Sequence, residues 1–389
     1  MNISKNKPIL IFLANFDWRD IFSTSFIELT DKMERDRLCP SINNFFIFSY
    51  ARRSYKKLDG QFKTVHKKTH IDTFRPLLDM WTLCTIPYVA WKYKVRPDVW
   101  VAYDFGMIPG LWIAQVLFGG KVVMCLNNQP RVYSRTRRFG AIKEIYSWFM
   151  ERTCVHFVKH FFTINETMRE YIKKIGVADL RITVFSMNTI DRDQEFISKA
   201  IKGNIRSQYH IDPNKKIIVT VARLEAEKNY PELLKLFAGL GSDYVLFGLG
   251  RGSLLQELTV QAKELGIADR VFFPGFVHRD QIWNYYVDAD VFVLISKAEA
   301  LGVVFWEAMH VGVPVIGSKI DGIVETIGVD GDRGRIWTPA DGLQGFVERV
   351  VFCTTQSLDR NAMLGRARAY VDTQRTNTIT INDVVCAIK

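Results

Sequence analysis

Two glutamates, Glu299 and Glu307, stand eight residues apart, just after an apolar run that predicts a strand at 291–296. Glu299 lies in the loop beyond the strand, and Glu307 lies about one turn into the helix that we expect from Val303. Carboxylates accept hydrogen bonds from sugar hydroxyls, and a helix N-terminus attracts a phosphate. Gly302 lets the backbone approach a ligand closely. The pattern favours binding of a phosphorylated sugar, and a solvated helix residue is the alternative for Glu307.

Two cations, Arg223 and Lys228, follow a second apolar run at 217–222, in a predicted strand-to-helix loop. Ligands of parallel sheets bind beyond the carboxyl ends of the strands, so this loop and the Glu299 loop belong to one edge. Two positive charges there can neutralise a diphosphate leaving group without a metal ion. An ordinary exposed charged loop is the alternative.

Three glycines lie in a third segment, Gly248-Leu-Gly250-Arg-Gly252, at the end of the apolar stretch 244–249. The third glycine departs from the spacing of the dinucleotide fingerprint, and no acidic residue ends the next strand at the expected place. Both departures argue against a nicotinamide oxidoreductase. The glycines still predict a close backbone approach, with Gly248 lining the same crevice.

Acidic pairs that resemble metal ligands have other interpretations. Asp288-Ala-Asp290 leads into a strand, at its amino end and away from the ligand edge, and Asp330-Gly-Asp332 is typical of a turn. The six cysteines are scattered without a Cys-x-x-Cys pair, which argues against a zinc site or a disulfide framework. We therefore expect no bound metal.

Alternating strand and helix patterns must position these loops. Candidate strands lie at 9–14, 45–50, 99–104, 122–126, 160–165, 217–222, 244–249, 271–276, 291–296 and 314–318. Amphipathic patterns at 231–240 and 254–266 predict helices between the later ones. The alternation predicts an α/β fold of parallel sheets with helices on both faces. It restarts at 217 after a passage at 188–214, and 389 residues suffice for two such domains.

Several segments, in their order along the chain, resemble the retaining glycosyltransferases of family 4. The segments are VARLEAEKN, FGLGRGSLLQEL, VFFPGFV, DADVFVLIS and EALGVVFWEAMHVGVPVIGS, which together cover most of 214–345. In the N-terminal half the likeness is weaker and is carried by RPDVWVAYD, TINETMREYI and VFSMNTID. The family folds as two facing Rossmann-like domains, called the B type, so the resemblance implies that fold.

The resemblance also implies a donor site for a nucleoside diphosphate sugar, such as a UDP- or GDP-sugar, with no cofactor. Arg223 and Lys228 are expected to hold the diphosphate. Glu307 is expected to bind the ribose, and Glu299 to bind the transferred sugar during a reaction that retains the anomeric configuration. Further donor contacts are expected at Gly248, Val277, Leu301, Gly302, Val303 and Val304.

Two departures from the family fall in the N-terminal half. The run 14–18 replaces a glycine-rich loop that often follows the family's first strand. Asn127 and Asn128 stand where many members carry a histidine beside the reacting sugar. We place Asn127 in the catalytic set as a hydrogen-bonding partner of a sugar hydroxyl, although neither asparagine can act as a base. Acceptor-side contacts are expected at Asn15, Asp17, Asn128 and Arg131.

By the same resemblance, the end of the chain is expected to cross back to the first domain. A helix predicted at 360–372 precedes the polar stretch 373–378, which suits a bridge between domains. The expected division is an acceptor-binding domain of 1–187 with 373–389, and a nucleotide-sugar domain of 188–372.

Charge is unevenly distributed along the chain. Residues 1–190 hold 29 Lys and Arg against 16 Asp and Glu, whereas 191–389 hold 23 against 25. The basic residues cluster near aromatic ones at 52–57, 63–68 and 131–138. This favours an anionic membrane surface and a lipid-linked or glycan acceptor, and no nucleic-acid motif accompanies the charge. The longest apolar stretch, 77–91, is too short to span a bilayer, so we expect a cytoplasmic protein, peripheral on the inner face of the membrane.

We therefore expect a hexosyltransferase-type enzyme that works without a metal ion. A nucleotide-sugar epimerase or a sugar phosphorylase of the same fold remains open, as does an inactive transferase-like partner subunit. The joint presence of two cations and two glutamates argues against an inactive site, because such a site has no physical need for all four. These residues do not name the sugar, the base or the acceptor.

Overall fold

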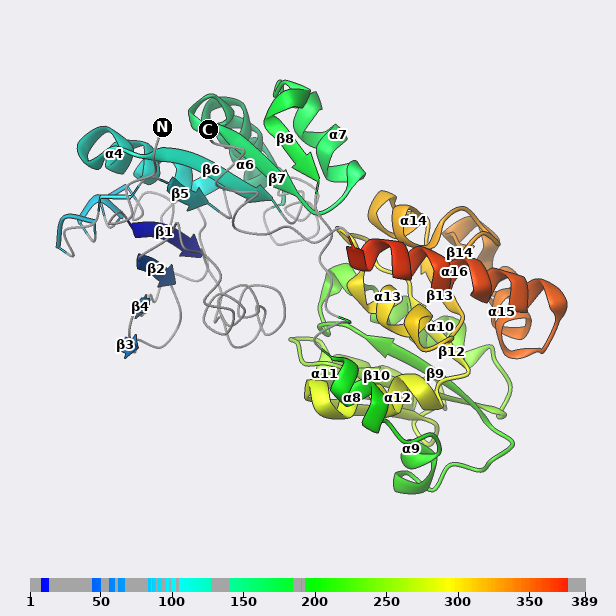
Figure 1. Ribbon diagram of the computed structural model, residues 1–389. Helices are drawn as coiled ribbons and strands as arrows, with labels where there is room; N and C mark the ends of the chain where they lie inside the picture. The colour runs from blue at the N-terminus through cyan, green and yellow to red at the C-terminus, as the bar shows by residue number, and fades with distance from the viewer. Residues whose placement is uncertain are drawn as a thin grey trace. The chain divides into compact units, whose positions relative to one another are not determined.

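The computed structural model divides the chain into two compact units (Figure 1). Unit 1 comprises 1–187 with 378–389, and unit 2 comprises 188–377. The residues that the structure describes are 8–13, 44–49, 56–59, 62–66, 83–84, 86–88, 90–92, 96–97, 99–102, 105–126, 140–184, 190 and 193–376. Each unit is built around its own sheet.

Unit 1 contains an eight-stranded sheet in the order β3-β4-β2-β1-β5-β6-β7-β8. Its strands are β1 Pro8–Leu13, β2 Asn44–Ser49, β3 Lys56–Asp59, β4 Phe62–His66, β5 Val99–Ala102, β6 Lys121–Leu126, β7 His160–Thr163 and β8 Ile182–Val184. Neighbouring strands are parallel except for β3 and β4. Only two residues join that pair, and so short a connection permits only an antiparallel hairpin. One antiparallel hairpin therefore borders a sheet that is otherwise parallel, as expected from the sequence.

Helices of unit 1 follow its strands as the alternation predicts. The helices are α4 Ile108–Phe118, α6 Gly140–Cys154 and α7 Glu166–Lys174, with 3₁₀ turns at η1 Phe105–Met107, η2 Val155–Phe157 and η3 Asp179–Arg181. The side chain of Asn165 caps α7 by accepting a hydrogen bond from the Met168 N–H at 3.0 Å. The strand residues Trp100, Met124 and Phe161 are fully buried and form part of the core.

Unit 2 contains a six-stranded sheet in the order β11-β10-β9-β12-β13-β14, with each neighbouring pair parallel. Its strands are β9 Lys216–Val221, β10 Tyr244–Leu249, β11 Val271–Gly275, β12 Val291–Leu294, β13 Val315–Ser318 and β14 Arg335–Trp337. The chain builds outward from β9 to β11 and then crosses to β12 on the other side of β9. The strand order therefore reverses between β9 and β12, which is where doubly wound sheets bind ligands.

Alternation along the strands of unit 2 supplies two apolar faces. Val291 and Val293 pack into a buried cluster with residues of α10, α11 and α15, whereas the intervening Phe292 contacts the rings of Tyr286 and Phe305 from α12 and α13. Each such side chain, fully buried, contributes about 1.5–3 kcal/mol. The helices are α8 Gln194–Lys199, α9 Asn204–Gln208, α10 Tyr230–Ala238, α11 Leu255–Glu264, α12 Arg279–Asp288, α13 Val303–His310, α14 Asp321–Ile327, α15 Gly342–Thr354 and α16 Leu358–Thr376, with 3₁₀ turns at η4 Ala226–Lys228 and η5 Pro339–Asp341.

The last described helix, α16, lies against α13 and is drawn red in Figure 1. It continues through Thr376, so the first residues of the polar stretch expected to bridge the domains are helical. The rest of the expected return segment, 377–389, lies outside the described residues. Within the part of the chain that is described, no helix is long and apolar enough to cross a membrane.

Candidate active site

The structure brings Lys228 and Glu299 together where the strand order of unit 2 reverses. Lys228 follows β9 and Glu299 follows β12, and these two strands are parallel neighbours, so both loops leave the same edge. The Lys228 Nζ lies 2.6 Å from Glu299 Oε2, and the side chains are only 10% and 14% exposed. A sheltered ion pair, largely excluded from solvent, therefore lies at the edge where doubly wound sheets bind ligands.

Glu227 connects the same two loops. Its backbone carbonyl accepts a hydrogen bond from the Lys297 N–H at 2.8 Å, which ties the loop after β9 to the loop after β12. Its buried carboxylate accepts from Arg223 Nη2 at 2.5 Å, while the Arg223 side chain remains 47% exposed. Both cations expected to face a diphosphate thus start from an ion pair with a neighbouring carboxylate.

The glycine loop packs against the chain itself. A Cβ on Gly250 would lie 2.0 Å from the Ala222 carbonyl oxygen, and one on Gly252 would lie 2.1 Å from that of Leu224. The Leu224 N–H also donates to the Arg251 carbonyl at 3.0 Å. The close approach expected from these glycines is therefore made to the loop that carries Arg223. Gly248 lies inside β10 with its α-carbon facing the Phe273 ring, and its donor contact stays a prediction.

Gly302 begins α13 in a left-handed conformation, with φ of +73°. A Cβ there would meet the Phe305 ring at 2.7 Å, so a larger residue would push the helix start away from the loop. Leu301 is buried, and Val303 and Val304 are half-buried in the first turn. The helix begins at the residue expected from the sequence, which leaves its first N–H groups beside the Glu299 loop.

Glu307 is 2% exposed, so the solvated alternative is wrong. Its Oε1 accepts a hydrogen bond from Arg279 Nη1 at 2.6 Å, and its Oε2 accepts one from the Tyr286 hydroxyl at 2.7 Å. The other Nη of Arg279 pairs with the buried carboxylate of Asp193. Burial disfavours the charged guanidinium, but the carboxylates of Glu307 and Asp193 raise the pKa of Arg279 above its usual value.

These partners of Glu307 escaped sequence analysis. Arg279 and Asp193 are 86 residues apart, and neither lies in a recognised motif. Burial, followed by the neighbouring Glu307 carboxylate, raises the pKa of Tyr286 well above its usual value, so its hydroxyl stays protonated and donates. No motif or spacing in the sequence marks these residues as neighbours of Glu307.

The acidic pairs set aside as metal ligands have structural partners. Asp288 accepts hydrogen bonds from the N–H groups of Gly203 and Ile205 at the start of α9. Asp290 pairs with Arg206 at 3.0 Å, at the amino end of the sheet. Asp330 accepts hydrogen bonds from the Arg335 side chain and from the Ile336 N–H, both in β14. The described residues contain no group of three or more His, Cys, Asp or Glu that could hold a metal.

Several expected site residues fall outside the described part of the chain. They are Asn15, Asp17, Asn127, Asn128 and Arg131. Val277 is described, half-buried, two residues after the end of β11.

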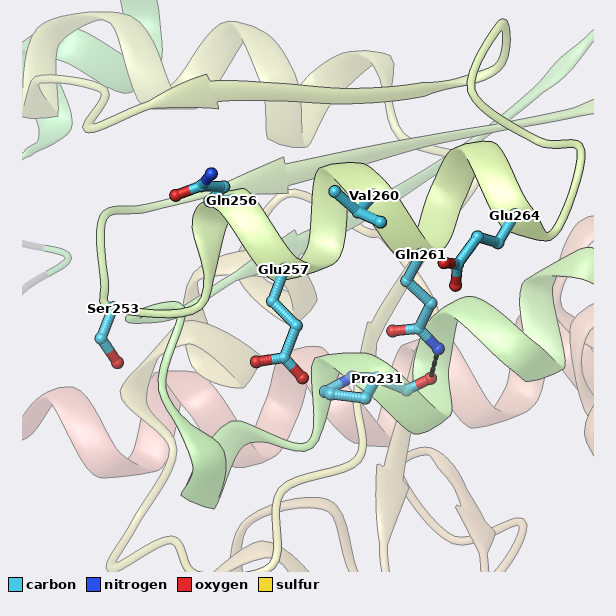
Figure 2. Close-up of a pocket in the computed structure, with 7 residues that line it drawn as sticks. All are labelled: Pro231, Ser253, Gln256, Glu257, Val260, Gln261 and Glu264. Atoms are coloured by element: carbon cyan, nitrogen blue, oxygen red, sulfur yellow. Dashed lines mark hydrogen bonds between the residues drawn. The ribbon is translucent and has the colours of Figure 1, made fainter.

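A pocket of about 680 Å³ lies elsewhere, between α10 and α11 (Figure 2). Its lining consists of Pro231, Ser253, Gln256, Glu257, Val260, Gln261 and Glu264. Gln261 Nε2 donates across it to the Pro231 carbonyl at 2.9 Å. None of the residues expected to bind donor lines this pocket. We therefore place the candidate site by topology and charge at the reversal point between β9 and β12.

Comparison with known proteins identifies unit 2. A family model described as glycosyl transferases group 1 matches residues 201–361. Residues 201–361 therefore form a group 1 glycosyltransferase domain. The match begins after α8 and ends inside α16, so this glycosyltransferase domain contains the sheet, the reversal point and the Lys228–Glu299 pair. The resemblance found in the sequence is confirmed.

Curated relatives match over about half of their own length. The chain is 29% identical to N-acetyl-alpha-D-glucosaminyl L-malate synthase of Bacillus anthracis over 46% of each chain. It is 26% identical to alpha-monoglucosyldiacylglycerol synthase of Streptococcus pneumoniae over 55% of this chain and 49% of that one. It is 28% identical to a GDP-mannose-dependent alpha-(1-6)-phosphatidylinositol monomannoside mannosyltransferase of Mycobacterium tuberculosis over 48% of this chain and 50% of that one.

Solved structures match almost the whole chain. Anabaena HepE in complex with UDP and glucose has a TM-score of 0.69 at 18% identity, covering 98% of this chain and 97% of that chain. WaaG, a glycosyltransferase involved in lipopolysaccharide biosynthesis, has a TM-score of 0.72 at 16% identity, covering 95% and 96%. At these identities the likeness shows the fold, which is that of the B-type glycosyltransferases. The expected fold class is confirmed.

Proposed function

We propose that this protein transfers a hexose from a nucleoside diphosphate sugar to an acceptor hydroxyl and retains the anomeric configuration. The observation that carries the proposal is the sheltered Lys228–Glu299 pair, which lies at the reversal point of a group 1 glycosyltransferase domain. An exposed charged loop would leave both side chains in water, whereas this pair is held between two loops. A charged group kept out of water at a ligand edge suits binding of a charged substrate.

Binding of the donor diphosphate would break the ion pairs of Lys228 and Arg223. Lys228 and Arg223 would turn from their carboxylates to the phosphate oxygens, and the first N–H groups of α13 would add to the stabilisation. Glu299, released from Lys228, would accept hydrogen bonds from hydroxyls of the transferred sugar. The binding of donor thereby replaces contacts to the two carboxylates with contacts to the phosphate oxygens.

The reaction breaks the bond between the anomeric carbon and the diphosphate oxygen. The departing diphosphate takes the electron pair, and Lys228 and Arg223 stabilise its charge. The acceptor hydroxyl attacks the anomeric carbon from the same face and gives its proton to the leaving phosphate oxygen. We name no covalent nucleophile, and we propose that two cations and a helix N-terminus make a divalent metal unnecessary.

The relatives indicate which donors and acceptors to test first. One structural neighbour was solved with UDP and glucose, and one relative is named for GDP-mannose, so both bases are candidates. Two relatives are named for diacylglycerol and phosphatidylinositol compounds. We propose a lipid-linked or glycan acceptor, reached at an anionic membrane surface.

Exposed aromatic side chains of unit 1 support the membrane proposal. Ile145, Trp148, Phe149 and Arg152 recur at helical spacing and are all exposed on α6. The exposed Trp112 of α4 contacts the Phe157 ring at 5.3 Å, and α4 also exposes Val116 and Leu117. Aromatic and apolar side chains beside cations suit the interface of a bilayer. The side chains of the three basic clusters lie outside the described part of the chain.

A thermal-shift panel of UDP-, GDP- and ADP-sugars tests the donor proposal. One donor is expected to raise the melting temperature in a saturable manner, and the corresponding free nucleoside diphosphate to do so as well. The stabilising donor is then incubated with and without acceptor. Epimerisation without acceptor would favour an epimerase, and no stabilisation by any donor would favour an inactive subunit.

A further inference from the structure

Arg279 is the centre of a buried network that joins three segments of unit 2. It is the first residue of α12, and its guanidinium contacts Glu307 on α13 and Asp193 just before α8. Glu307 is 2% exposed and Asp193 is fully buried. The network therefore links the carboxylate expected to bind donor ribose with the segment that begins unit 2.

The charges of this network hold the side chains of Arg279 and Glu307 in one arrangement. Two buried carboxylates share a single guanidinium, and each uses a different Nη atom. The Tyr286 hydroxyl binds the second oxygen of Glu307 at 2.7 Å, so both oxygens of that carboxylate are held. Losing one partner would leave a buried carboxylate undercompensated. Arg279 is thus fixed at one side by Asp193 and fixes Glu307 at the other.

We propose that Arg279 is a positioning residue for the donor site, and that it makes nucleotide affinity depend on Asp193. The inference rests on the proposed function, because it takes Glu307 to contact the donor. A carboxylate can bind a ribose diol well only if its oxygens already point at the hydroxyls. Arg279 and Tyr286 supply that orientation, although neither is expected to touch the ligand. Asp193 acts one step further away, by holding Arg279 in a single rotamer.

Conservative variants of the two flanking residues test this proposal in the full-length protein. Asp193→Asn keeps the shape of the side chain but removes its charge, and Tyr286→Phe removes a single hydroxyl. Tyr285→Phe is the matched control, because Tyr285 neighbours Tyr286 on α12 and its hydroxyl contacts Tyr209, 3.1 Å away, instead of Glu307. The readouts are the dissociation constants of UDP and GDP by titration calorimetry and the melting temperature of each variant.

The proposal predicts weaker nucleotide binding in Asp193→Asn and Tyr286→Phe, by roughly three- to thirtyfold, the range for residues that act through a neighbour. Tyr285→Phe is expected to bind like the wild type. With a transfer assay, the donor KM should rise while kcat and the acceptor KM change little, as expected when uniform binding is lost.

The results that would overturn this proposal differ from those that would overturn the proposed donor site. A lower melting temperature in both variants with unchanged nucleotide affinity would show a merely structural network and overturn the proposal. If Asp193→Asn does not fold, Tyr286→Phe alone decides through the same comparison with Tyr285→Phe. Failure of the wild type to bind either nucleotide would instead overturn the proposed donor site, and this inference with it.

Discussion

At the scale of single residues, the cations of the candidate site are already paired with carboxylates before any donor binds. Lys228 pairs with Glu299, Arg223 with Glu227, and Arg279 with two carboxylates. Pairing keeps buried charges tolerable, since removing one member of a buried pair commonly costs about 3–5 kcal/mol. The same pairing means that a substitution can change both stability and affinity, so each functional test needs a stability measurement beside it.

We predict that Lys228→Ala lowers the transfer rate at least on the order of 10²-fold, because a preorganised charge on the leaving group is lost. Lys235→Ala is the control, since Lys235 is an exposed lysine on the following helix, α10. Steady-state rates at saturating donor measure the effect. Near-normal turnover in well-folded Lys228→Ala would remove the donor-site assignment.

Glu307 calls for a milder substitution than alanine. Because the side chain is buried against Arg279, Glu307→Ala is expected to destabilise the fold by about 3 kcal/mol. Glu307→Gln keeps the shape and one acceptor oxygen, so it should fold and yet lose kcat/KM for the donor on the order of 10²-fold, through a higher donor KM. Thermal melts and rates of the two variants separate these effects, and full activity in Glu307→Gln would contradict a donor role.

We also predict full activity in EDTA. Two cations and a helix N-terminus offset the diphosphate charge, so chelation should change the rate less than about twofold. The assay compares EDTA, added Mg²⁺ and added Mn²⁺ at the same donor concentration. Loss of activity in EDTA with recovery on adding either metal would refute this expectation.

Spacing in the sequence predicts part of the site. Lys228 and Glu299 each follow a predicted strand, and parallel strands gather their carboxyl ends, so their meeting follows from topology. The Arg279 network does not, because Asp193 and Tyr286 reach it through tertiary packing of α8, α12 and α13. The acceptor-side expectations at Asn15 and Asn128 lie outside the described residues and stay predictions.

At the scale of elements, the longer apolar runs in the sequence predicted strands correctly, whereas the short strands and the polar strands were missed. The buried runs at β9, β10 and β12 need no other strand signal. The short strands β3 and β4, with sequences KKLD and FKTVH, carry mostly polar residues and were not predicted. The end of α16 was placed too early, because TQRT is polar but compatible with a helix, and Thr373 Oγ1 bonds back to the Tyr370 carbonyl at 2.6 Å.

We predict that Gly250→Ala destabilises the protein by about 1–3 kcal/mol, since the added Cβ would collide with the Ala222 carbonyl. The displaced 222–224 loop carries Arg223, so donor affinity should fall as well. Gly365→Ala, in the middle of α16 with open space around it, is the control and should stabilise by roughly 0.5–1 kcal/mol. Denaturant melts that show equal effects for both variants would contradict the tight loop contact.

We predict that anionic liposomes bind the protein at low salt through unit 1. Sedimentation with anionic lipid should fall in high salt, in the triple variant Arg135→Glu, Arg137→Glu, Arg138→Glu, and in the α6 double variant Trp148→Ala, Phe149→Ala. Val260→Ala, which changes an exposed apolar residue of unit 2, is the control. Equal sedimentation with neutral and anionic liposomes would refute the electrostatic contact, and no sedimentation with either would indicate a soluble acceptor.

At the scale of the whole molecule, the charge and the candidate donor site are distributed unevenly between the two units. The glycosyltransferase domain is nearly neutral and carries the candidate donor site, while residues 1–190 hold the excess of cations. The strand pattern restarts at 217, where β9 begins the second sheet, and the division of roles between the two units stays a prediction. The return of the chain to unit 1 after α16, inferred by resemblance, stays a prediction, and it begins later than the expected residue 373 because α16 extends through Thr376.

Retaining transfer of a hexose is tested most directly by the anomeric configuration of the product. Proton NMR of a reaction with the donor that best stabilises the protein reports the anomeric coupling of donor and product. We expect stoichiometric release of the nucleoside diphosphate and a product with the donor's anomeric configuration, both abolished in Lys228→Ala and preserved in Lys235→Ala. A product of inverted configuration, or donor consumption that is unchanged in Lys228→Ala, would contradict this expectation.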